Sequence, residues 1–255
     1  MREIHFIAGF CSVALIASAA PAVAQGFDVS GLPALSSAQG EDGATTYSLS
    51  LQILALMTAL TLLPSLVLGM SSFTRIIIVL SILRQALGTQ QTPPNQVLIA
   101  IALFLSLFIM QPTLTQIYDS ALSPFLSETI SADAAIAEAS RVMKDFMVAN
   151  TRRDTLLMFS DMVGATAYES NADIPFSTLL PAFITSELKT AFQIGFLIFL
   201  PFLVVDMVIA SILMSLGMMM LSPMLVSLPF KLLLFVLVDG WAMTVGSLAA
   251  TFSTP

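Results

Sequence analysis

The sequence has little charge and almost no reactive side chains. Only 10% of its 255 residues are charged, 9 basic and 16 acidic, and it has one cysteine and one histidine. An average soluble domain has about 25% charged residues, so this chain lacks the polar surface that a soluble fold needs. The net charge of -7 excludes a typical nucleic-acid binder. With 57% apolar residues and a mean hydropathy of +0.93, the chain is expected in a membrane or inside a large assembly.

The N-terminus is predicted to be a cleavable secretory signal. Arg2 precedes an apolar run at 6–20, and the small-residue pattern of a signal-peptidase site follows, with cleavage after Ala24. An uncleaved anchor helix is the alternative, but the run is short for a span and Pro21 follows it.

Cleavage would also remove the most reactive side chains. Cys11 and His5 both lie in the signal, so the mature chain would contain neither a thiol nor an imidazole. We therefore expect no metal site, no cofactor and no catalysis that depends on cysteine or histidine.

Four apolar segments of helical length predict an all-α fold of the membrane type. They cover about residues 49–70, 97–110 (closed by Pro112), 190–216 and 230–250. The charged stretch 119–173 has apolar residues at helical spacing, which indicates amphipathic helices. We expect two kinked hydrophobic helical hairpins with an amphipathic helical insert between them. The predicted parts are a signal peptide (1–24), a flexible periplasmic lead-in (25–48), a first hydrophobic hairpin (49–112), an amphipathic periplasmic insert (113–185) and a second hydrophobic hairpin (186–255).

The distribution of charge predicts the topology. A signal would place the start of the mature chain outside the inner membrane. The first crossing would then end at Arg75 and Arg84 on the inside, and the acidic insert would lie outside. Lys231 would mark the second inside connection, as the positive-inside rule requires.

Two carboxylates, Asp206 and Asp239, fall inside apolar segments. An ionised carboxylate that faces lipid costs roughly 2.5–3.5 kcal/mol, so each needs a partner, a polar cavity or a proton. We prefer a structural pair with Lys231, Lys189 or a neighbouring chain. A proton relay is the alternative, but a relay needs several titratable groups in file and the sequence offers few.

Glu187 and Lys189 precede the third apolar segment and are two positions apart. On a helix this spacing points the two side chains to different faces, so each is predicted to meet a separate partner, across a subunit boundary in one interpretation. Charged ends that simply reach the water at the membrane interface are the alternative.

Methionine is concentrated near one turn. Met218, Met219 and Met220 are consecutive, directly after Gly217 and shortly before Pro223. A consecutive run cannot share one helical face, so we expect it in a loop or a helix break. Flexible apolar thioethers at that place would form a compressible constriction in a ring of subunits, whereas plain packing of a buried turn is the alternative.

Two large aromatic residues, Phe146 and Phe159, lie in the charged insert. A core position is the default interpretation of both. An anchor between subunits is the alternative.

Longer motifs give the chain a resemblance to a known family. The first hairpin contains SSFTRIIIVL at 71–80, LRQALGT at 83–89 and PPNQVL at 93–98. Later stretches are LPAFITSELKTAFQIGF at 180–196, GMMMLSP at 217–223, LPFK at 228–231 and LVDGW at 237–241. In this order, across about residues 47–250, these motifs resemble the FliP family of flagellar biosynthetic proteins.

The resemblance implies a non-enzymatic core subunit of the flagellar type III protein-export gate. In that family five copies assemble with one FliR and several FliQ subunits around a channel for unfolded flagellar proteins. It implies a multi-pass inner-membrane protein of the flagellar basal body, with other export-gate proteins as partners and an assembled gate largely above the bilayer. By position it assigns a pore gasket to Met218, Met219 and Met220. Subunit contacts would fall to Glu187, Phe146 and Phe159.

Three alternatives stay open. An injectisome export gate has an equivalent subunit that shares much of the pattern, although the FTRIII form and the signal favour the flagellar branch. A secondary transporter or proton channel would use Asp206 and Asp239. An intramembrane enzyme is disfavoured, because no paired-aspartate motif stands out.

Overall fold

The structure is a computed structural model, and it describes residues 35–39, 45–49, 51–89, 91–164, 168, 170–218 and 221–252. The predicted signal with its cleavage site at Ala24 lies outside these residues, and so do Met219 and Met220. The chain divides into two compact units, Met1–Thr61 and Leu62–Pro255, which are described in turn.

The first unit contains a small antiparallel sheet of two strands, β1 (Leu35–Gln39) and β2 (Thr45–Leu49), followed by the start of helix α2 (Leu51–Gly69). Leu35 pairs with Leu49 at the open end of the ladder. The sequence predicts no strands here. The sheet therefore departs from the all-α prediction, and the β-branched and aromatic residues at the start of β2 are those that favour extended backbone.

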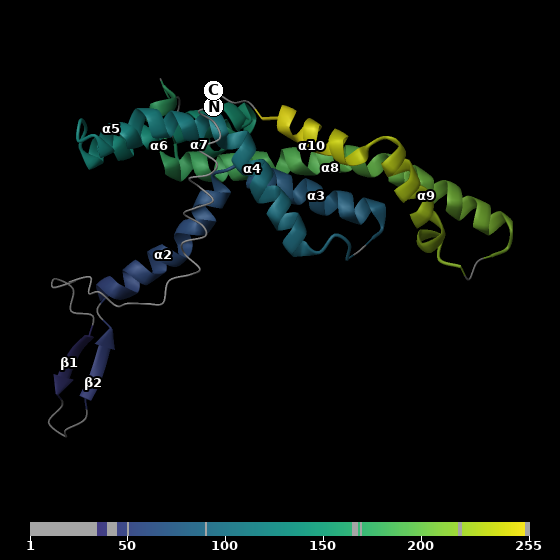
Figure 1. The fold of residues 1–255 in the computed structure, drawn as a ribbon, viewed down its shortest axis with the longest axis horizontal. Helices are drawn as coiled ribbons and strands as arrows, with labels where there is room; N and C mark the ends of the chain where they lie inside the picture. The colour runs from purple at the N-terminus through teal and green to yellow at the C-terminus, as the bar shows by residue number, and fades with distance from the viewer. Residues whose placement is uncertain are drawn as a thin grey trace. The chain divides into compact units, whose positions relative to one another are not determined.

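The described part of the second unit is helical, which confirms the predicted all-α class there (Figure 1). After the end of α2 its elements are α3 (Phe73–Leu87), α4 (Asn95–Ile117), the π-helical turn η1 (Tyr118–Leu122), α5 (Ser123–Leu126), α6 (Ala132–Asn150), α7 (Arg153–Met162), the 3₁₀ turn η2 (Asn171–Asp173), α8 (Phe176–Ser215), α9 (Pro223–Leu237) and α10 (Gly240–Ala250).

Membrane-length helices occur in two pairs, as predicted. By length and composition, two helices can cross a membrane: Asn95–Leu126, which joins α4, η1 and α5, and α8. Two bent pairs also qualify if each pair counts as one span: α2 with α3, and α9 with α10, the latter bent by 63°. The amphipathic helices α6 and α7 lie between the two pairs in the sequence, so the predicted order of hairpin, insert and hairpin is confirmed.

Several prolines lie inside helices, and one of them stands where the sequence predicts a helix end. Pro112 is expected to close the second apolar segment, whereas the helix continues past it to Leu126. Pro181 and Pro201 both lie within α8, which has 40 residues. Neighbouring helices can stabilise the backbone around such prolines. At about 1.5 Å per residue α8 is ~60 Å long, twice the ~30 Å thickness of a hydrocarbon core.

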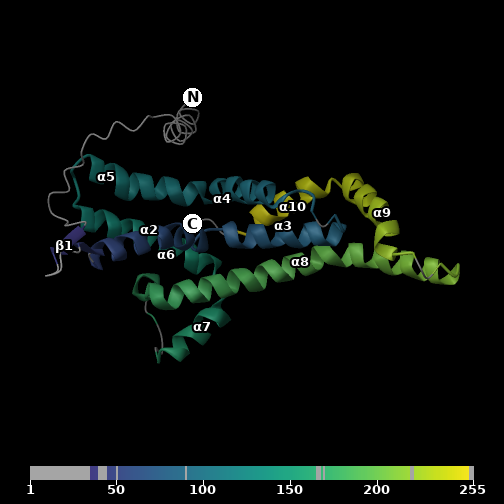
Figure 2. The same ribbon diagram turned by 90° about the horizontal axis from the view of Figure 1, so that it is seen from below.

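The core of the second unit lies where α3 packs against α8 (Figure 2). Both helices contribute fully buried apolar side chains, among them Val79, Leu80, Leu179 and Phe183. Gly195 of α8 allows the close approach, because a Cβ atom there would lie only 2.4 Å from Cδ1 of Ile82.

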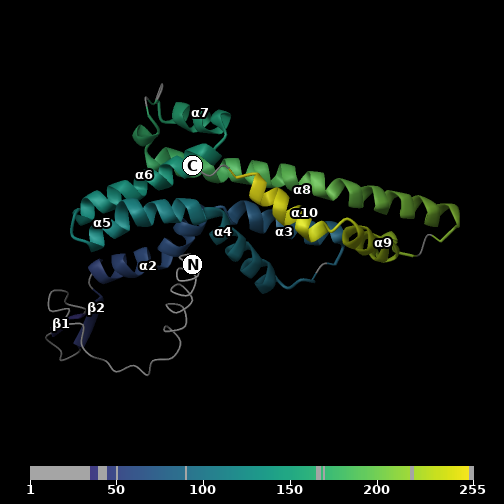
Figure 3. The ribbon, with the colours of Figure 1, turned by 45° about the horizontal axis from the view of Figure 1, so that its top comes forward.

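Helix α9 packs against α8, and α10 then lies beside α4, so that Thr251 reaches Arg75 at the start of α3 (Figure 3). The bend between α9 and α10 is fixed by local backbone and packing. Asp239 adopts left-handed torsion angles (φ 50°, ψ 55°), and a Cβ on Gly240 would lie 2.2 Å from the ring of Phe235. This path ends with Phe252 in the same core as α3 and α8.

Candidate functional site

Glu187 of α8 and Arg75 of α3 form a buried ion pair. Nε of Arg75 donates to Oε2 of Glu187 at 2.8 Å, and Nη2 donates to Oε1. The side chains are 3% and 0% exposed. Nη1 of Arg75 donates to the carbonyl oxygen of Thr251 at 2.9 Å and to its Oγ1 at 3.0 Å. The guanidinium also lies 3.8 Å from the ring centroid of Phe252, so one arginine joins α3, α8 and the segment after α10.

This pair corrects the predicted topology. The sequence places Arg75 at the inner end of the first crossing, whereas Glu187 precedes the third crossing at its outer end. A direct contact requires both residues at the same end. At the opposite end of α3, the carbonyl of Ala86 meets Lys231. Arg75 is therefore an internal partner for Glu187 rather than an inside anchor, and α3 runs parallel to α8.

Glu187 and Lys189 meet separate partners, as their spacing predicts. Nζ of Lys189 donates to Oδ2 of Asp154 in α7 at 2.9 Å, and both side chains are exposed. The hydrogen bond from Lys189 lowers the pKa of the Asp154 carboxyl. Both partners belong to the same chain, so roles of Glu187 and Lys189 in subunit contacts stay predictions.

Asp206 pairs with Lys231, which confirms the structural interpretation of that carboxylate. Nζ of Lys231 donates to Oδ2 of Asp206 at 2.6 Å and to the carbonyl oxygen of Ala86 at 3.0 Å. Oγ of Ser227 donates to Oδ1 of Asp206 at 2.6 Å. The Lys231 side chain is 3% exposed and that of Asp206 is 35% exposed. These contacts join α3, α8 and α9.

Asp239 differs from the expectation of a buried charge. It lies at the bend between α9 and α10 and is exposed in the single chain. Its position in an apolar stretch follows from the helix break, because the exposed bend allows a carboxylate to avoid burial.

The methionine run begins at a helix break, as predicted. Gly217 is left-handed (φ 74°) and ends α8. Its amide donates to the carbonyl of Met214 at 3.1 Å, and the amide of Met218 donates to the carbonyl of Leu213 at 3.0 Å. This pattern is a Schellman motif, for which glycine is the preferred residue. The Met218 side chain is 43% exposed, directly after the helix end. Its gasket role, and those of Met219 and Met220, stay predictions.

The two aromatic residues of the insert lie in different surroundings. Phe146 is fully buried, and its ring centroid lies 6.3 Å from that of Phe183. This is the core position that the default interpretation gives. Phe159 is half-buried on α7. An anchor between subunits stays a prediction for both.

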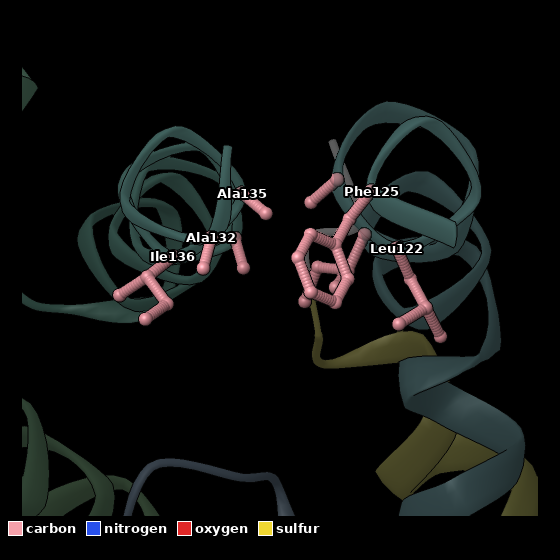
Figure 4. Close-up of a pocket in the computed structure, with 8 residues that line it drawn as sticks. Leu122, Phe125, Ala132, Ala135 and Ile136 are labelled. Carbon is pink, nitrogen blue, oxygen red and sulfur yellow. The ribbon is translucent and has the colours of Figure 1, made fainter. Parts of the chain in front are cut away.

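An apolar pocket lies between α5 and α6 (Figure 4). Its volume is about 380 Å³, and its walls include Phe125, Ala132 and Ile136. It holds no polar side chain that could bind a cofactor or position a reactant. Within the described residues, no three His, Cys, Asp or Glu side chains lie together as metal ligands.

Sequence reasoning missed several partners of the predicted charges. Arg75, Thr251 and Ser227 complete the networks around Glu187 and Asp206, and the sequence predicted this role for none of them. One signal was present: Arg75 stands inside an apolar helix, as Asp206 does, and a charge in such a place needs an opposite charge.

Comparisons with known proteins give a consistent result. The model of the FliP family matches residues 56–248. A flagellar biosynthetic protein FliP from Cereibacter sphaeroides is 75% identical over 222 residues, which cover 87% of this chain and 73% of that protein. The FliP of Buchnera aphidicola subsp. Acyrthosiphon pisum (strain APS) is 52% identical over 223 residues, 88% of this chain and 59% of that protein. The FliP of Pectobacterium carotovorum subsp. carotovorum is 51% identical over 221 residues, which cover 87% of this chain and 86% of that protein.

Proposed function

Because this chain belongs to the FliP family, we propose that it is a core subunit of the flagellar type III protein-export gate in the bacterial inner membrane. The family gives it a role in flagellar biosynthesis. The proposal adds that copies of the chain, five in number, assemble with FliR and FliQ subunits at the basal body. Together they enclose a channel through which unfolded flagellar proteins pass.

One observation carries the channel proposal: flexible apolar side chains are exposed around the break between α8 and α9. The Gly217 motif ends α8 abruptly and leaves Met218 at the surface. Further exposed methionines lie on both sides of the break, at Met207, Met214 and Met224. Thioether side chains adapt to irregular surfaces. In a ring of copies, Met218 with the adjacent Met219 and Met220 would close an empty pore and still yield to a polypeptide.

The exposed faces of the second hairpin support assembly. Large apolar residues stay exposed along α8 and α9, among them Phe192, Phe196, Leu197, Val204, Leu225, Leu233 and Val236. A soluble monomer does not leave an apolar patch of this kind in water. Lipid or further subunits must cover it, which is compatible with a membrane-associated assembly.

Replacement of the methionine run tests the gasket. Met218→Ala, Met219→Ala and Met220→Ala are combined in one variant, and the control is Met162→Ala, an exposed methionine of the insert. We expect the triple variant to raise the leak of ions and small solutes through the assembled gate, because shorter side chains leave a wider constriction. Wild-type leak and wild-type export in the triple variant would contradict the gasket proposal.

The mass of the purified complex tests the partners. The chain is co-expressed with FliQ and FliR, extracted in detergent and weighed by native mass spectrometry. We expect several copies of this chain in one particle with both partners. A chain that is recovered alone would contradict the gate proposal. Proton flux through vesicles that hold this chain alone would favour the transporter instead. The ion pair of Asp206 with Lys231 argues against that alternative, because it gives the carboxylate a structural role.

A further inference from the structure

A polar cavity lies where the end of α6 and the start of α7 meet α8. Its volume is about 250 Å³. It presents two guanidinium groups, one amide side chain and three threonine hydroxyls, from Arg75, Asn150, Thr151, Arg152, Thr190 and Thr251. Ligand pockets for drug-sized molecules begin at about 300 Å³, so this cavity suits a single side chain or a small acid.

The positive charge at the cavity is not balanced. Arg75 is neutralised by Glu187, and the nearby Lys189 is neutralised by Asp154. Among the described residues, however, no carboxylate lies within ion-pair distance of Arg152. In a chain of net charge -7, an uncompensated arginine at a polar cavity stands out.

Arg152 is held in place by neutral groups. Its Nε donates to Oγ1 of Thr190 at 3.2 Å, its Nη2 donates to Oε1 of Gln193, and its backbone amide donates to Oγ of Ser186 at 2.9 Å. These contacts fix the half-buried side chain, and among the described residues the donors on Nη1 have no acceptor. A guanidinium that is fixed in this way loses little conformational entropy when it binds an anion.

The carboxyl end of α6 also faces the cavity, and its backbone carbonyls carry a partial negative charge, opposite to that of the guanidinium groups. Its carbonyls are largely occupied: Nδ2 of Asn150 donates to the carbonyl of Phe146 at 2.9 Å, and Oγ1 of Thr151 donates to that of Met147 at 2.6 Å. The positive end of α7 begins beside Arg152 and adds a field of the same sign as the guanidinium. The cavity therefore favours an anion.

From these observations we infer that this cavity binds a carboxylate, with Arg152 as the group that recognises it. Guanidinium and carboxylate match in charge and in planar geometry, and such pairs are among the stronger hydrogen-bonded contacts in proteins. The Thr190 hydroxyl accepts from Arg152 and can donate to a remaining lone pair, whereas the hydroxyls of Thr151 and Thr251 already donate to backbone carbonyls.

In the assembly of several copies that the proposed function requires, the carboxylate comes from a second copy of this chain. The insert carries exposed acidic side chains, such as Asp133 and Asp161, without ion-pair partners among the described residues. In a ring, one surface of each copy meets a different surface of the next. Such a contact can place an acid of one insert in the cavity of its neighbour.

Titration of the full chain in detergent micelles tests the cavity. The monomeric fraction is titrated with sodium succinate by calorimetry at constant ionic strength, with sodium chloride as the reference. The variants are Arg152→Gln and Arg152→Lys, and the matched control is Arg153→Gln, which removes the adjacent exposed arginine. We expect Arg152→Gln to raise the succinate Kd by about tenfold or more, and Arg153→Gln to leave it within about twofold.

Absence of saturable succinate binding to the wild-type chain overturns the inference, and so does equal weakening by Arg152→Gln and Arg153→Gln. Thermal melting shows whether Arg152→Gln folds. If it does not fold, Arg152→Lys takes its place, because it keeps the charge and loses the planar fork. Affinity equal to wild type in Arg152→Lys then overturns the role of Arg152.

The source of the carboxylate is tested on the assembled particle. We expect Arg152→Gln, and not Arg153→Gln, to shift the particle toward monomers. Succinate binding without this shift would overturn the second copy as the source and leave a free small acid. The methionine triple variant tests the channel independently of Arg152. Failure of the export proposal would appear in that variant, whereas failure of the carboxylate-binding proposal would appear in Arg152→Gln.

Discussion

Arg75 and Glu187 lie 112 positions apart in the sequence and form a two-pronged ion pair whose side chains are 3% and 0% exposed. Removing two charges from water costs several kcal/mol per ion, and only good geometry with further hydrogen bonds offsets this. Thr251 and Phe252 complete the surroundings of the guanidinium. Removal of either side chain therefore leaves the other charge buried without its partner, and the cost of its desolvation is no longer offset.

Glu187→Ala is expected to lower the free energy of unfolding by about 3–5 kcal/mol, because it leaves the Arg75 guanidinium buried without its carboxylate. Thermal or chemical denaturation in detergent micelles measures the change. The matched control is Glu138→Ala, which removes one of the two carboxylate partners of the exposed Arg141 and should alter stability little. Equal melting temperatures of the two variants would contradict the importance of burial.

The pair between Asp206 and Lys231 predicts an asymmetry. Asp206→Ala leaves a 3% exposed ammonium whose one remaining partner among the described residues is the carbonyl of Ala86. Lys231→Met leaves a carboxylate that is 35% exposed and still accepts a hydrogen bond from Ser227. We therefore expect Asp206→Ala to lower the melting temperature more than Lys231→Met. A larger loss in Lys231→Met would show that the carboxylate carries the greater desolvation cost.

Gly195→Ala tests the close packing of α3 on α8. The new Cβ would overlap the side chain of Ile82, and overpacking of this kind typically costs about 1–3 kcal/mol. Ile82→Val removes the nearest atom and should restore part of the loss in a double-mutant cycle. Gly246→Ala in α10 is the control, since no atom of the described part of the chain lies within 4 Å of a Cβ there. Additive effects of the Gly195 and Ile82 substitutions would rule out the proposed overlap.

Lys189→Gln should raise the pKa of Asp154 toward the ordinary aspartate value, because the hydrogen bond from Lys189 is the main cause of its depression. Carboxyl chemical shifts, followed against pH by NMR, measure this. Because the folded pKa lies below the unfolded value of about 3.9, the pair stabilises the fold above that value and loses its contribution as the pH falls through the folded pKa. An unchanged Asp154 pKa in Lys189→Gln would assign the depression to another group.

The sequence predicts much of the helical arrangement, because composition and length decide membrane-type helices. The helix boundaries that the sequence predicts are less accurate. Pro112 lies within a helix rather than at its end, since packing partners can compensate a missing backbone donor, and single-sequence reasoning does not see those partners. The strands β1 and β2 fall in a stretch whose glycine and serine content favours a flexible segment.

The partners of charged side chains are likewise only partly predictable from the sequence. The pairing of Asp206 with Lys231 is predictable, because a carboxylate in an apolar helix needs a cation and few are available. The pairing of Glu187 with Arg75 is not, because the positive-inside rule assigns Arg75 a surface role before its neighbours are known. Arg152 has no distinguishing sequence pattern, and only the fold places it at a polar cavity.

During biosynthesis, Arg75 is made long before its hydrogen-bond partners. Its last hydrogen-bond partner, Thr251, emerges from translation 176 residues later. At common bacterial elongation speeds the interval is roughly 9–35 s. The carboxylate of Glu187 follows 112 residues after Arg75, so in the first part of that interval the nascent polypeptide holds a cation without its carboxylate partner. Insertion machinery or chaperones that shield this residue would therefore act at least until Glu187 has been synthesised.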